Sequence, residues 1–269
     1  LTRSMKGLCV AGTHGKSTTT SMLAHLLHQS HVGCNAFLGG ITKNYGTNYL
    51  LNSESEYVVI EADEFDRSFH QLRPYATVIT AADADHLDIY GTVEAYLESF
   101  AHAENLRIGG GRITFDLVSP LGNIEGVELG VPVSINIDNG IAAMALAQVA
   151  GATADEIREA MATFAGVDRR FDFQIKTDSL VFLSDYAHHP EEIRQSILSL
   201  REVFGGRKIT AIFQPHLYTR TRDFYREFAE ALSLLDEVIL TEIYPARELP
   251  IEGVSSQLIY DALRPDMEK

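Results

Sequence analysis

Short apolar runs alternate with helical patterns along the chain, and several of these runs lead directly into glycines, acids or histidines. The first run, 7–11, is followed by Gly12-Thr13-His14-Gly15-Lys16-Ser17-Thr18 and then by apolar residues at helical spacing up to Gln29. Continuous apolar runs are typical of strands that are buried on both faces of a parallel sheet. We therefore expect a strand, a glycine-rich loop and a crossover helix at the start of the chain.

Two later apolar runs end in clusters of acids. The run 57–60 leads into Glu61-Ala62-Asp63-Glu64-Phe65-Asp66, and the run 76–80 leads into Asp83-Ala84-Asp85-His86-Leu87-Asp88. Ligands of open α/β sheets bind beyond the carboxyl ends of the strands, so we expect both clusters near the glycine-rich loop. Glu61 is the candidate ligand for Mg²⁺, and His86 is a candidate metal ligand or base. A solvated acidic turn is the alternative for the first cluster, although it fits the later acids better than Glu61.

The middle of the chain has weaker strand signals. The segment 39–46 contains few apolar residues and two glycine sites, which predicts a loop. A helix is expected to begin at Tyr96, but the helical pattern ends abruptly near 101–104, and we expect residues to be missing there. Thr153 and Glu156 have the spacing of a capping box. We expect edge strands at 112–117 and 126–133, and helices at 140–150 and 155–164.

Around 166–171 the pattern changes from helical to extended, and we place a domain boundary there, between 1–167 and 168–269. Beyond it strands and helices alternate, which predicts a second, doubly wound Rossmann-like sheet. The expected strands are 173–176, 180–184, 208–213 and 238–240, and the expected helices are 191–204, 223–232 and 256–263. The predicted fold class is α/β, with a phosphate-loop domain around a mostly parallel sheet and a C-terminal Rossmann-like domain.

The glycine-rich loop has the residue types that bind a polyphosphate. Gly12 and Gly15 allow backbone N–H groups to face the phosphates, and the positive end of the following helix points at them. Lys16 is placed for the β- and γ-phosphates, and Ser17 offers a hydroxyl to Mg²⁺. Cys9 stands where the full phosphate-loop pattern has its first glycine, so a plain glycine-rich turn is the alternative.

Composition narrows the class of partner. The chain of 269 residues has 22 basic and 37 acidic residues and a net charge of −15. Nucleic acids are held by clustered Lys and Arg, so we expect no nucleic-acid partner. We find no apolar run of the roughly 18 residues that a membrane span needs, and no signal-peptide pattern, so we expect no membrane partner and a cytoplasmic location.

The cysteines and three histidines have no metal-like arrangement. Cys9 and Cys34 are far apart, and Cys9 lies in an apolar strand, where it is expected to act as a small buried hydrophobe. Met22 is expected in the core. His14, His25 and His28 are expected to be solvated rather than metal-bound.

Six motifs occur in the order GTHGKS, EADEFD, DADHLD, DRRF, DYAHHP and FQPHLYTRTRD. With these motifs nearly the whole chain resembles the Mur ligases. The resemblance implies the central ATPase domain followed by the C-terminal domain, without the N-terminal UDP-binding domain of the family. Two residues depart from the family pattern: Ile135 replaces a His before Asn136, and Leu217 replaces an Arg.

The resemblance also implies roles for individual residues. Lys16, Glu61, His86 and Arg170 would be catalytic, with Ser17 and Glu61 at one Mg²⁺ and His86 at a second. The nucleotide would contact Gly12, Thr13, His14, Gly15, Lys16, Ser17, Thr18, Asn136, Asn139, Arg170 and Asp185, with the two asparagines on the adenine side. The substrate side would contain Tyr186, His188 and Arg220.

The activity implied by the resemblance is ATP-dependent amide ligation. L-alanine would be joined to the lactyl carboxylate of UDP-N-acetylmuramate through an acyl phosphate, with ATP and Mg²⁺ as cofactors. A murein-peptide ligase or a folylpolyglutamate-type ligase is the alternative within the same chemistry, and the 214–222 loop argues against both. An ATP-binding switch or scaffold that hydrolyses ATP without ligation is the alternative from another class.

Overall fold

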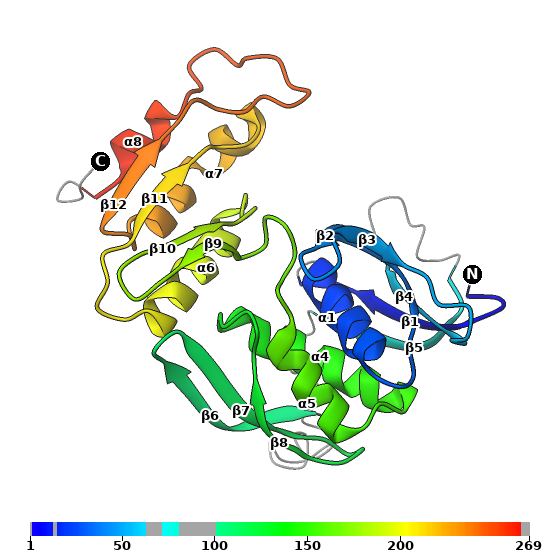
Figure 1. Cartoon of the computed structure of the whole chain (residues 1–269). Coiled ribbons are helices and arrows are strands. Elements are labelled where there is room, and N and C mark those ends of the chain that lie inside the picture. Colours follow the sequence, from blue (N-terminus) through cyan, green and yellow to red (C-terminus); the bar gives the residue numbers. More distant parts are fainter. Residues whose placement is uncertain (1, 13–14, 63–71, 81–100, 265–269) are drawn as a thin grey trace, which may run out of the picture. The chain divides into compact units, whose positions relative to one another are not determined.

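The computed structural model describes residues 2–12, 15–62, 72–80 and 101–264 (Figure 1). The chain divides into two compact units, Leu1–Asp185 and Tyr186–Lys269. The α/β fold class predicted from the sequence is confirmed by both units. The domain boundary at 167/168 stays a prediction.

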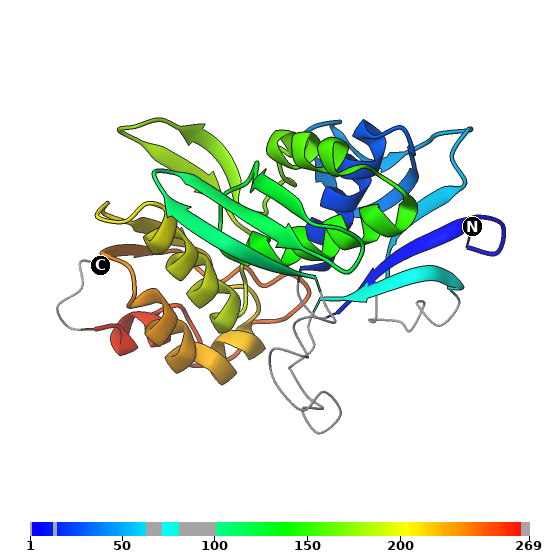
Figure 2. The same ribbon diagram turned by 90° about the horizontal axis from the view of Figure 1, so that it is seen from below.

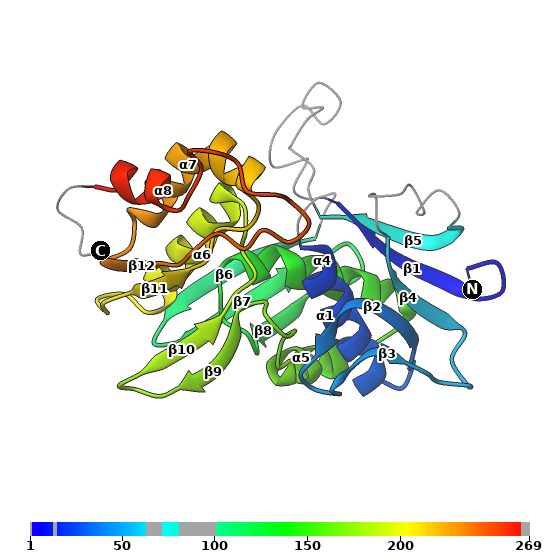
Figure 3. The same ribbon diagram turned by 90° about the horizontal axis from the view of Figure 1, so that it is seen from above.

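The first unit is built on a five-stranded sheet in the order β3-β2-β4-β1-β5 (Figure 3). The strand β1 pairs in parallel with both β4 and β5, and β2 continues the parallel part by pairing with β4, whereas β3 is antiparallel to β2. The strands are β1 (Lys6–Ala11), β2 (Asn35–Thr42), β3 (Thr47–Leu50), β4 (Tyr57–Glu61) and β5 (Pro74–Ile79). The sheet therefore directs the carboxyl ends of β1, β2, β4 and β5 to one edge.

The prediction of a loop at 39–46 is wrong for the first half of this segment, because Gly39–Thr42 belong to β2. The strand has glycine at positions 39 and 40 because neighbouring side chains leave no room for a Cβ atom at either position. A Cβ on Gly39 would lie 2.3 Å from Glu61 Oε2, and a Cβ on Gly40 would lie 2.6 Å from Val167 Cγ1. Close approach of neighbouring groups, rather than a turn, explains this pair of glycines.

Among the described residues of the first unit, three helices pack in its core: α1 (Lys16–Gln29), α4 (Ile135–Ala150) and α5 (Ala154–Thr163). The first of them packs against β2 and β4 and against the other two helices. Met22 is buried in this core as predicted. The capping box of Thr153 and Glu156 is confirmed: the threonine hydroxyl accepts the Glu156 N–H, and the glutamate carboxylate accepts the Thr153 N–H.

The prediction that His25 is solvated is wrong. Its side chain is 2% exposed, and its ring nitrogens lie 2.7 Å from Tyr45 Oη and 3.0 Å from Thr163 Oγ1. Burial lowers the pKa of this imidazole from its ordinary value to about 4. His28, one turn further along the helix, is exposed, while Cys9 and Cys34 are buried thiols whose pKa values are raised by burial to about 11 and 12.

A separate antiparallel sheet of three strands packs against α4 and α5 (Figure 2). It consists of β6 (His102–Gly109), β7 (Arg112–Val118) and β8 (Ile124–Glu128). The last two fall on the strands expected at 112–117 and 126–133, although β8 ends earlier than predicted. The first strand was missed, because HAENLRIG is mostly polar and its side chains are largely exposed.

The first unit ends in an antiparallel pair, β9 (Asp172–Lys176) and β10 (Val181–Ser184). The second unit contains a parallel pair, β11 (Thr210–Phe213) and β12 (Glu237–Leu240). Its helices are α6 (Pro190–Val203), α7 (Tyr218–Leu232) and α8 (Gln257–Ala262). The apolar faces of these helices and of the two parallel strands meet in one core, which includes Ile193, Ile197, Phe213, Phe228, Leu232, Val238 and Ile259.

Helix α7 begins five residues before the predicted start at Asp223. Phe224 interrupts it with a non-helical backbone, φ −124° and ψ 16°, so the helix is kinked there. The helix predicted from the sequence, 223–232, corresponds mainly to the part of α7 after this kink. The first turns of α7 are polar and were not predicted as helical. No helix among the described residues is both long enough and apolar enough to cross a membrane.

Candidate nucleotide and substrate sites

The glycine-rich loop joins the end of β1 to the start of α1. Gly12 has a φ of 125° and Gly15 a φ of 80°, a left-handed backbone that favours glycine, and Gly15 caps the helix. Lys16 Nζ donates to the Gly12 carbonyl at 2.6 Å, so the ammonium lies against the loop. Thr13 and His14 lie outside the described residues. A helix N-terminus preceded by such a loop is suited to an anionic ligand.

Ser17 and Glu61 meet beside this loop. Ser17 Oγ donates to Glu61 Oε1 at 2.9 Å, and the Gly39 N–H donates to Glu61 Oε2 at 2.9 Å. Their proximity follows from the sheet, since Val10 of β1 is in register with Glu61 of β4. A hydroxyl and a carboxylate beside the loop are the oxygen donors that Mg²⁺ prefers. The described residues contain no group of three His, Cys, Asp or Glu side chains fit to hold a metal. His86 lies outside the described residues, and its metal role stays a prediction.

Asn136 and Asn139 are buried against the same loop. Thr19 Oγ1 donates to Asn139 Oδ1 at 3.1 Å, Asn139 Nδ2 donates to Asn136 Oδ1 at 3.2 Å, and Asn136 Nδ2 donates to the Val131 carbonyl at 3.1 Å. A Cβ on Gly15 would lie 2.4 Å from Asn139 Oδ1. The two asparagines therefore support the loop from α4. The contribution of Thr19 was missed, because a threonine within a helical run gives no sequence signal for such a contact.

Arg170 lies in a tight turn fixed by backbone contacts. Its N–H donates to the Val167 carbonyl at 3.0 Å, and the Asp168 N–H donates to the Ile41 carbonyl at 3.0 Å. The next residue, Phe171, donates its N–H to Asp185 Oδ1 at 3.4 Å. The structure thus brings the turn that carries Arg170 together with Asp185, two positions predicted to serve the nucleotide.

In the second unit, Tyr186, His188 and Arg220 form one cluster. The Tyr186 and His188 rings lie 5.3 Å apart, and Arg220 Nη1 donates to the His188 carbonyl at 3.4 Å. Two further residues join them: His216 lies 6.4 Å from the His188 ring, and it stacks on Tyr244 at 5.3 Å. Partial burial, followed by the charge of Arg220, lowers the pKa of His216. Neither His216 nor Tyr244 was predicted as a site residue, although His216 stands within the FQPHLYTRTRD motif.

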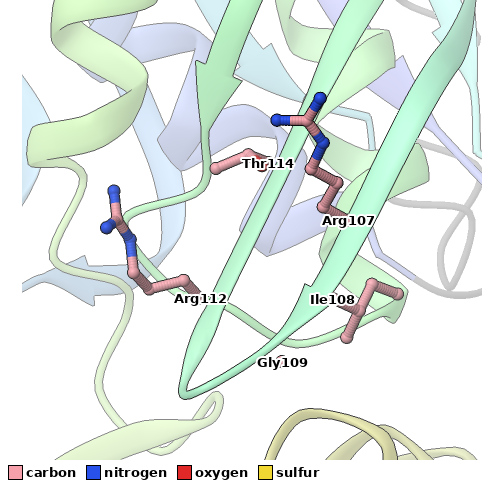
Figure 4. Close-up of a pocket in the computed structure, with 5 residues that line it drawn as sticks. All are labelled: Arg107, Ile108, Gly109, Arg112 and Thr114. Atoms are coloured by element: carbon pink, nitrogen blue, oxygen red, sulfur yellow. The ribbon is translucent and has the colours of Figure 1, made fainter.

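A cavity of about 420 Å³ opens on the β6–β7 hairpin and contains none of these residues. It is lined by Arg107, Ile108, Gly109, Arg112 and Thr114 (Figure 4). The Arg112 guanidinium forms two hydrogen bonds with the Glu128 carboxylate. The charge of Arg107 makes a small contribution to the lowered pKa of Asp116. The charge of Arg112 is thus already paired with a carboxylate.

Comparison with known proteins connects these features to one family. The Mur ligase middle domain matches residues 10–107, and the Mur ligase glutamate ligase domain matches residues 169–269. Among solved structures, UDP-N-acetylmuramate–alanine ligase from Thermotoga maritima has a TM-score of 0.75 and 29% sequence identity, and the match covers 96% of this chain and 64% of that protein. Folylpolyglutamate synthetase from Lactobacillus casei, at 15% identity and a TM-score of 0.65, shares the fold.

Curated relatives are more similar in sequence. UDP-N-acetylmuramate–L-alanine ligase from Phocaeicola vulgatus is 64% identical, and the alignment covers 100% of this chain and 68% of the relative. The enzyme of the same name from Parabacteroides distasonis is 57% identical, with 97% and 65% covered. The chain thus spans about two thirds of the length of these relatives. The alignment with the Phocaeicola enzyme extends over 309 positions for the 269 residues of this chain, so that enzyme has internal residues without a counterpart here. On these matches, the chain belongs to the Mur ligase family.

Proposed function

We propose that the protein containing this chain is an ATP-dependent ligase that joins L-alanine to the lactyl carboxylate of UDP-N-acetylmuramate. The observation that carries the proposal is the Ser17–Glu61 pair beside the glycine-rich loop, in a chain that is 64% identical over its whole length to an enzyme of that name. The relatives' substrates, UDP-N-acetylmuramate and alanine, are inferred from those names. The product would be a precursor of peptidoglycan.

The nucleotide would be ATP, with its phosphates on the loop between Gly12 and Ser17. Lys16 would contact the β- and γ-phosphates, Asn136 and Asn139 would lie on the adenine side, and Asp185 would contact the nucleotide. Ser17 and Glu61 fit one Mg²⁺ because both offer oxygen and lie 2.9 Å apart. Bound Mg²⁺ would neutralise phosphate charge as a Lewis acid. Thr13, His14, Thr18 and, for a second Mg²⁺, His86 complete the proposed set.

The chemistry begins with a repulsion that the protein has to offset. When the lactyl carboxylate attacks the γ-phosphate, two anions approach each other, and Lys16 and Arg170 are the cations proposed to stabilise that charge. The bond from the γ-phosphorus to ADP breaks as the carboxylate–phosphorus bond forms, which yields an acyl phosphate. Removing one preorganised group of this kind typically costs about 3–4 kcal/mol in the transition state.

The second step forms the amide. The alanine amine attacks the activated carbonyl carbon, inorganic phosphate leaves with the bonding electrons, and the amine loses a proton. Tyr186, His188 and Arg220 are proposed to hold the substrates, since they cluster together in the second unit. The acyl phosphate has to be kept from water, which is a reason for a site that closes around it.

The alternatives are a murein-peptide or folylpolyglutamate-type ligase and, from another class, an ATP-binding switch or scaffold. A murein peptide ligase from Psychrobacter arcticus shares the fold, with a TM-score of 0.57 and 21% sequence identity. The alanine ligase from Phocaeicola vulgatus is 64% identical, and we therefore prefer L-alanine as the proposed substrate. An ATP-binding switch or scaffold would hydrolyse ATP without ligation. A cytoplasmic location without nucleic-acid or membrane partners stays a prediction of the sequence.

Phosphate release separates these functions. With Mg·ATP and UDP-N-acetylmuramate present, we expect release to rise when L-alanine is added, and to rise less with glycine or a tripeptide. Release that is the same with and without an amino acid would favour the switch, and release that depends on a peptide would favour the murein peptide ligase.

A further inference from the structure

The second half of β2 and the residue that follows the strand contact two separate parts of the proposed nucleotide site. Near the middle of β2, the Gly39 N–H binds the carboxylate of Glu61. Two residues further along the strand, the Ile41 carbonyl accepts the Asp168 N–H at 3.0 Å, and just after the strand the Lys43 N–H donates to the Gly166 carbonyl at 3.0 Å. One strand therefore fixes both the acid proposed for Mg²⁺ and the segment that leads to Arg170.

The turn that carries Arg170 is strained. Arg169 has a φ of 61° and Phe171 a φ of 45°, so a left-handed residue stands on each side of the arginine. Such a conformation is unfavourable for a residue other than glycine, because its Cβ comes too close to the backbone. A turn of this kind persists only when its surroundings hold it. The contacts that hold it are therefore candidates for a role in placing Arg170.

The Lys43 side chain is one of these contacts. Its ammonium forms an ion pair with Asp172 Oδ1 and donates to the Phe173 carbonyl at 3.2 Å. The other oxygen of the same carboxylate, Asp172 Oδ2, accepts the Arg169 N–H at 3.4 Å. The Asp172 side chain is 8% exposed, and a carboxylate so buried needs a partner of opposite charge. Lys43 supplies this charge from the end of β2 and thereby ties the strained turn to the strand.

We propose that Lys43 is a positioning residue for phosphoryl transfer, which acts by pairing with Asp172 and so holding the turn that presents Arg170. This inference rests on the proposed function for the role of Arg170. The effect of the ion pair on the reaction is transmitted through the backbone of Arg169, whose N–H is bound by the paired carboxylate.

A double-mutant cycle tests whether Lys43 acts through Arg170. Alanine-dependent phosphate release is measured for the wild-type chain, Lys43→Met, Arg170→Ala and the double variant. We expect Arg170→Ala to lower kcat about 100-fold and Lys43→Met about 10-fold, with the double variant close to Arg170→Ala alone. A lysine with a merely structural role would give additive losses, with the double variant about 1,000-fold down, and this result would overturn the proposal.

Two matched variants distinguish a loss of the positioning role from a loss of folding. Lys43→Arg keeps the positive charge and should restore kcat to within about threefold of wild type. Lys6→Met removes a lysine that is also ion-paired, with Glu56, but is exposed on β1, and it should change kcat less than twofold. If Lys43→Arg is as inactive as Lys43→Met although both are folded, or if Lys43→Met behaves as Lys6→Met does, the positioning role is refuted.

Amide hydrogen exchange gives a readout that does not depend on catalysis. In the Lys43→Met variant, the amides of Arg169 and Phe171 should exchange at least about tenfold faster, whereas those in the interior of α1 should keep their wild-type rates. Unchanged exchange at the turn would overturn the inference even if the protein is the proposed ligase. Faster exchange in a chain without alanine-dependent phosphate release would instead mean that the proposed function fails while the ion pair still holds the turn.

Discussion

The loop region of the first unit and the histidine–tyrosine cluster of the second unit are built differently. Around the loop, Thr19, Asn136 and Asn139 are all at least nine-tenths buried and hydrogen-bonded to one another. In the cluster, Tyr186 and Tyr244 are 44% and 51% exposed, and the contacts are mainly between rings or with backbone carbonyls.

The difference suggests a division of work. Stabilising charge on a transferring phosphate depends on dipoles and cations that are already fixed before the reaction, because moving them would consume the stabilisation. Recognition of a small substrate tolerates side chains that adjust, and rings with open faces suit it. The buried network around the loop fits the first task, and the exposed cluster fits the second. The following predictions test this contrast, from the largest effect to the smallest.

The largest effect is expected from Lys16→Ala. Loss of the ammonium beside the Gly12 carbonyl should lower phosphoryl transfer by a factor of about 10²–10³, because one preorganised cation is removed at the charge that develops. The melting temperature should change little. Turnover of ATP and far-UV circular dichroism are measured on the same samples, with Lys6→Ala as the control. Wild-type turnover in the Lys16 variant would show that the loop is not the phosphate site.

His25 should make the stability of the first unit depend on pH. Its pKa is lowered to about 4 in the folded protein by burial, so only the unfolded chain takes up this proton as the pH falls from about 6.5 toward 4. The stabilisation is therefore complete above pH 6.5 and is lost toward pH 4, by about 3 kcal/mol in total. Urea unfolding between pH 4 and 7 measures it.

The variant His25→Gln should show a shallower dependence of the unfolding free energy on pH than the wild type. The exposed His28 on the same helix provides the matched control, since His28→Gln leaves the buried imidazole in place. An unchanged pH dependence in His25→Gln would mean that another group titrates in this range.

Gly39→Ala should disturb the acid without touching the loop. A Cβ there would come within 2.3 Å of the Glu61 carboxylate, so the carboxylate has to leave Ser17 or the strand has to move. We expect kcat to fall about 10- to 30-fold and the Mg²⁺ concentration for half-maximal rate to rise. Gly46→Ala, at φ 65° with nothing near its Cβ, should lose stability but keep the Mg²⁺ dependence. An unaltered Mg²⁺ dependence in both variants would remove Glu61 from the metal site.

The smallest effect is expected in the exposed cluster. Arg220→Met removes the guanidinium next to the His188 carbonyl and should raise the KM for the non-nucleotide substrates about tenfold, while the KM for Mg·ATP stays within twofold. Arg222→Met, whose arginine is exposed and paired with Asp223, should leave both KM values unchanged. If Arg220→Met instead raises the KM for Mg·ATP alone, the division of work between the two regions is wrong.

Particular elements show how far the sequence can be interpreted. The strand, loop and helix between Lys6 and Gln29 were predicted within a residue or two, and so was Glu61 at the exit of β4. These features depend on local patterns, namely apolar runs, glycines and the first polar residue after a buried strand. The two strands that were not predicted correctly have weak or misleading local patterns. In β6 few positions are apolar, and the glycines of β2 resemble those of a turn.

The sequence by itself determined the α/β class, the strand, glycine-rich loop and helix at the start of the chain, Glu61 at the end of β4 and the family, because each rests on neighbouring residues whose types and spacing suffice. Only the tertiary structure decided which partners meet. Thr19 and Asn139, which are 120 positions apart, share a hydrogen bond, His25 is enclosed by Tyr45 and Thr163, and Lys43 pairs with Asp172. The physical reason is that such contacts depend on how distant elements pack, and a polar side chain looks the same in the sequence whether packing buries it or leaves it in water.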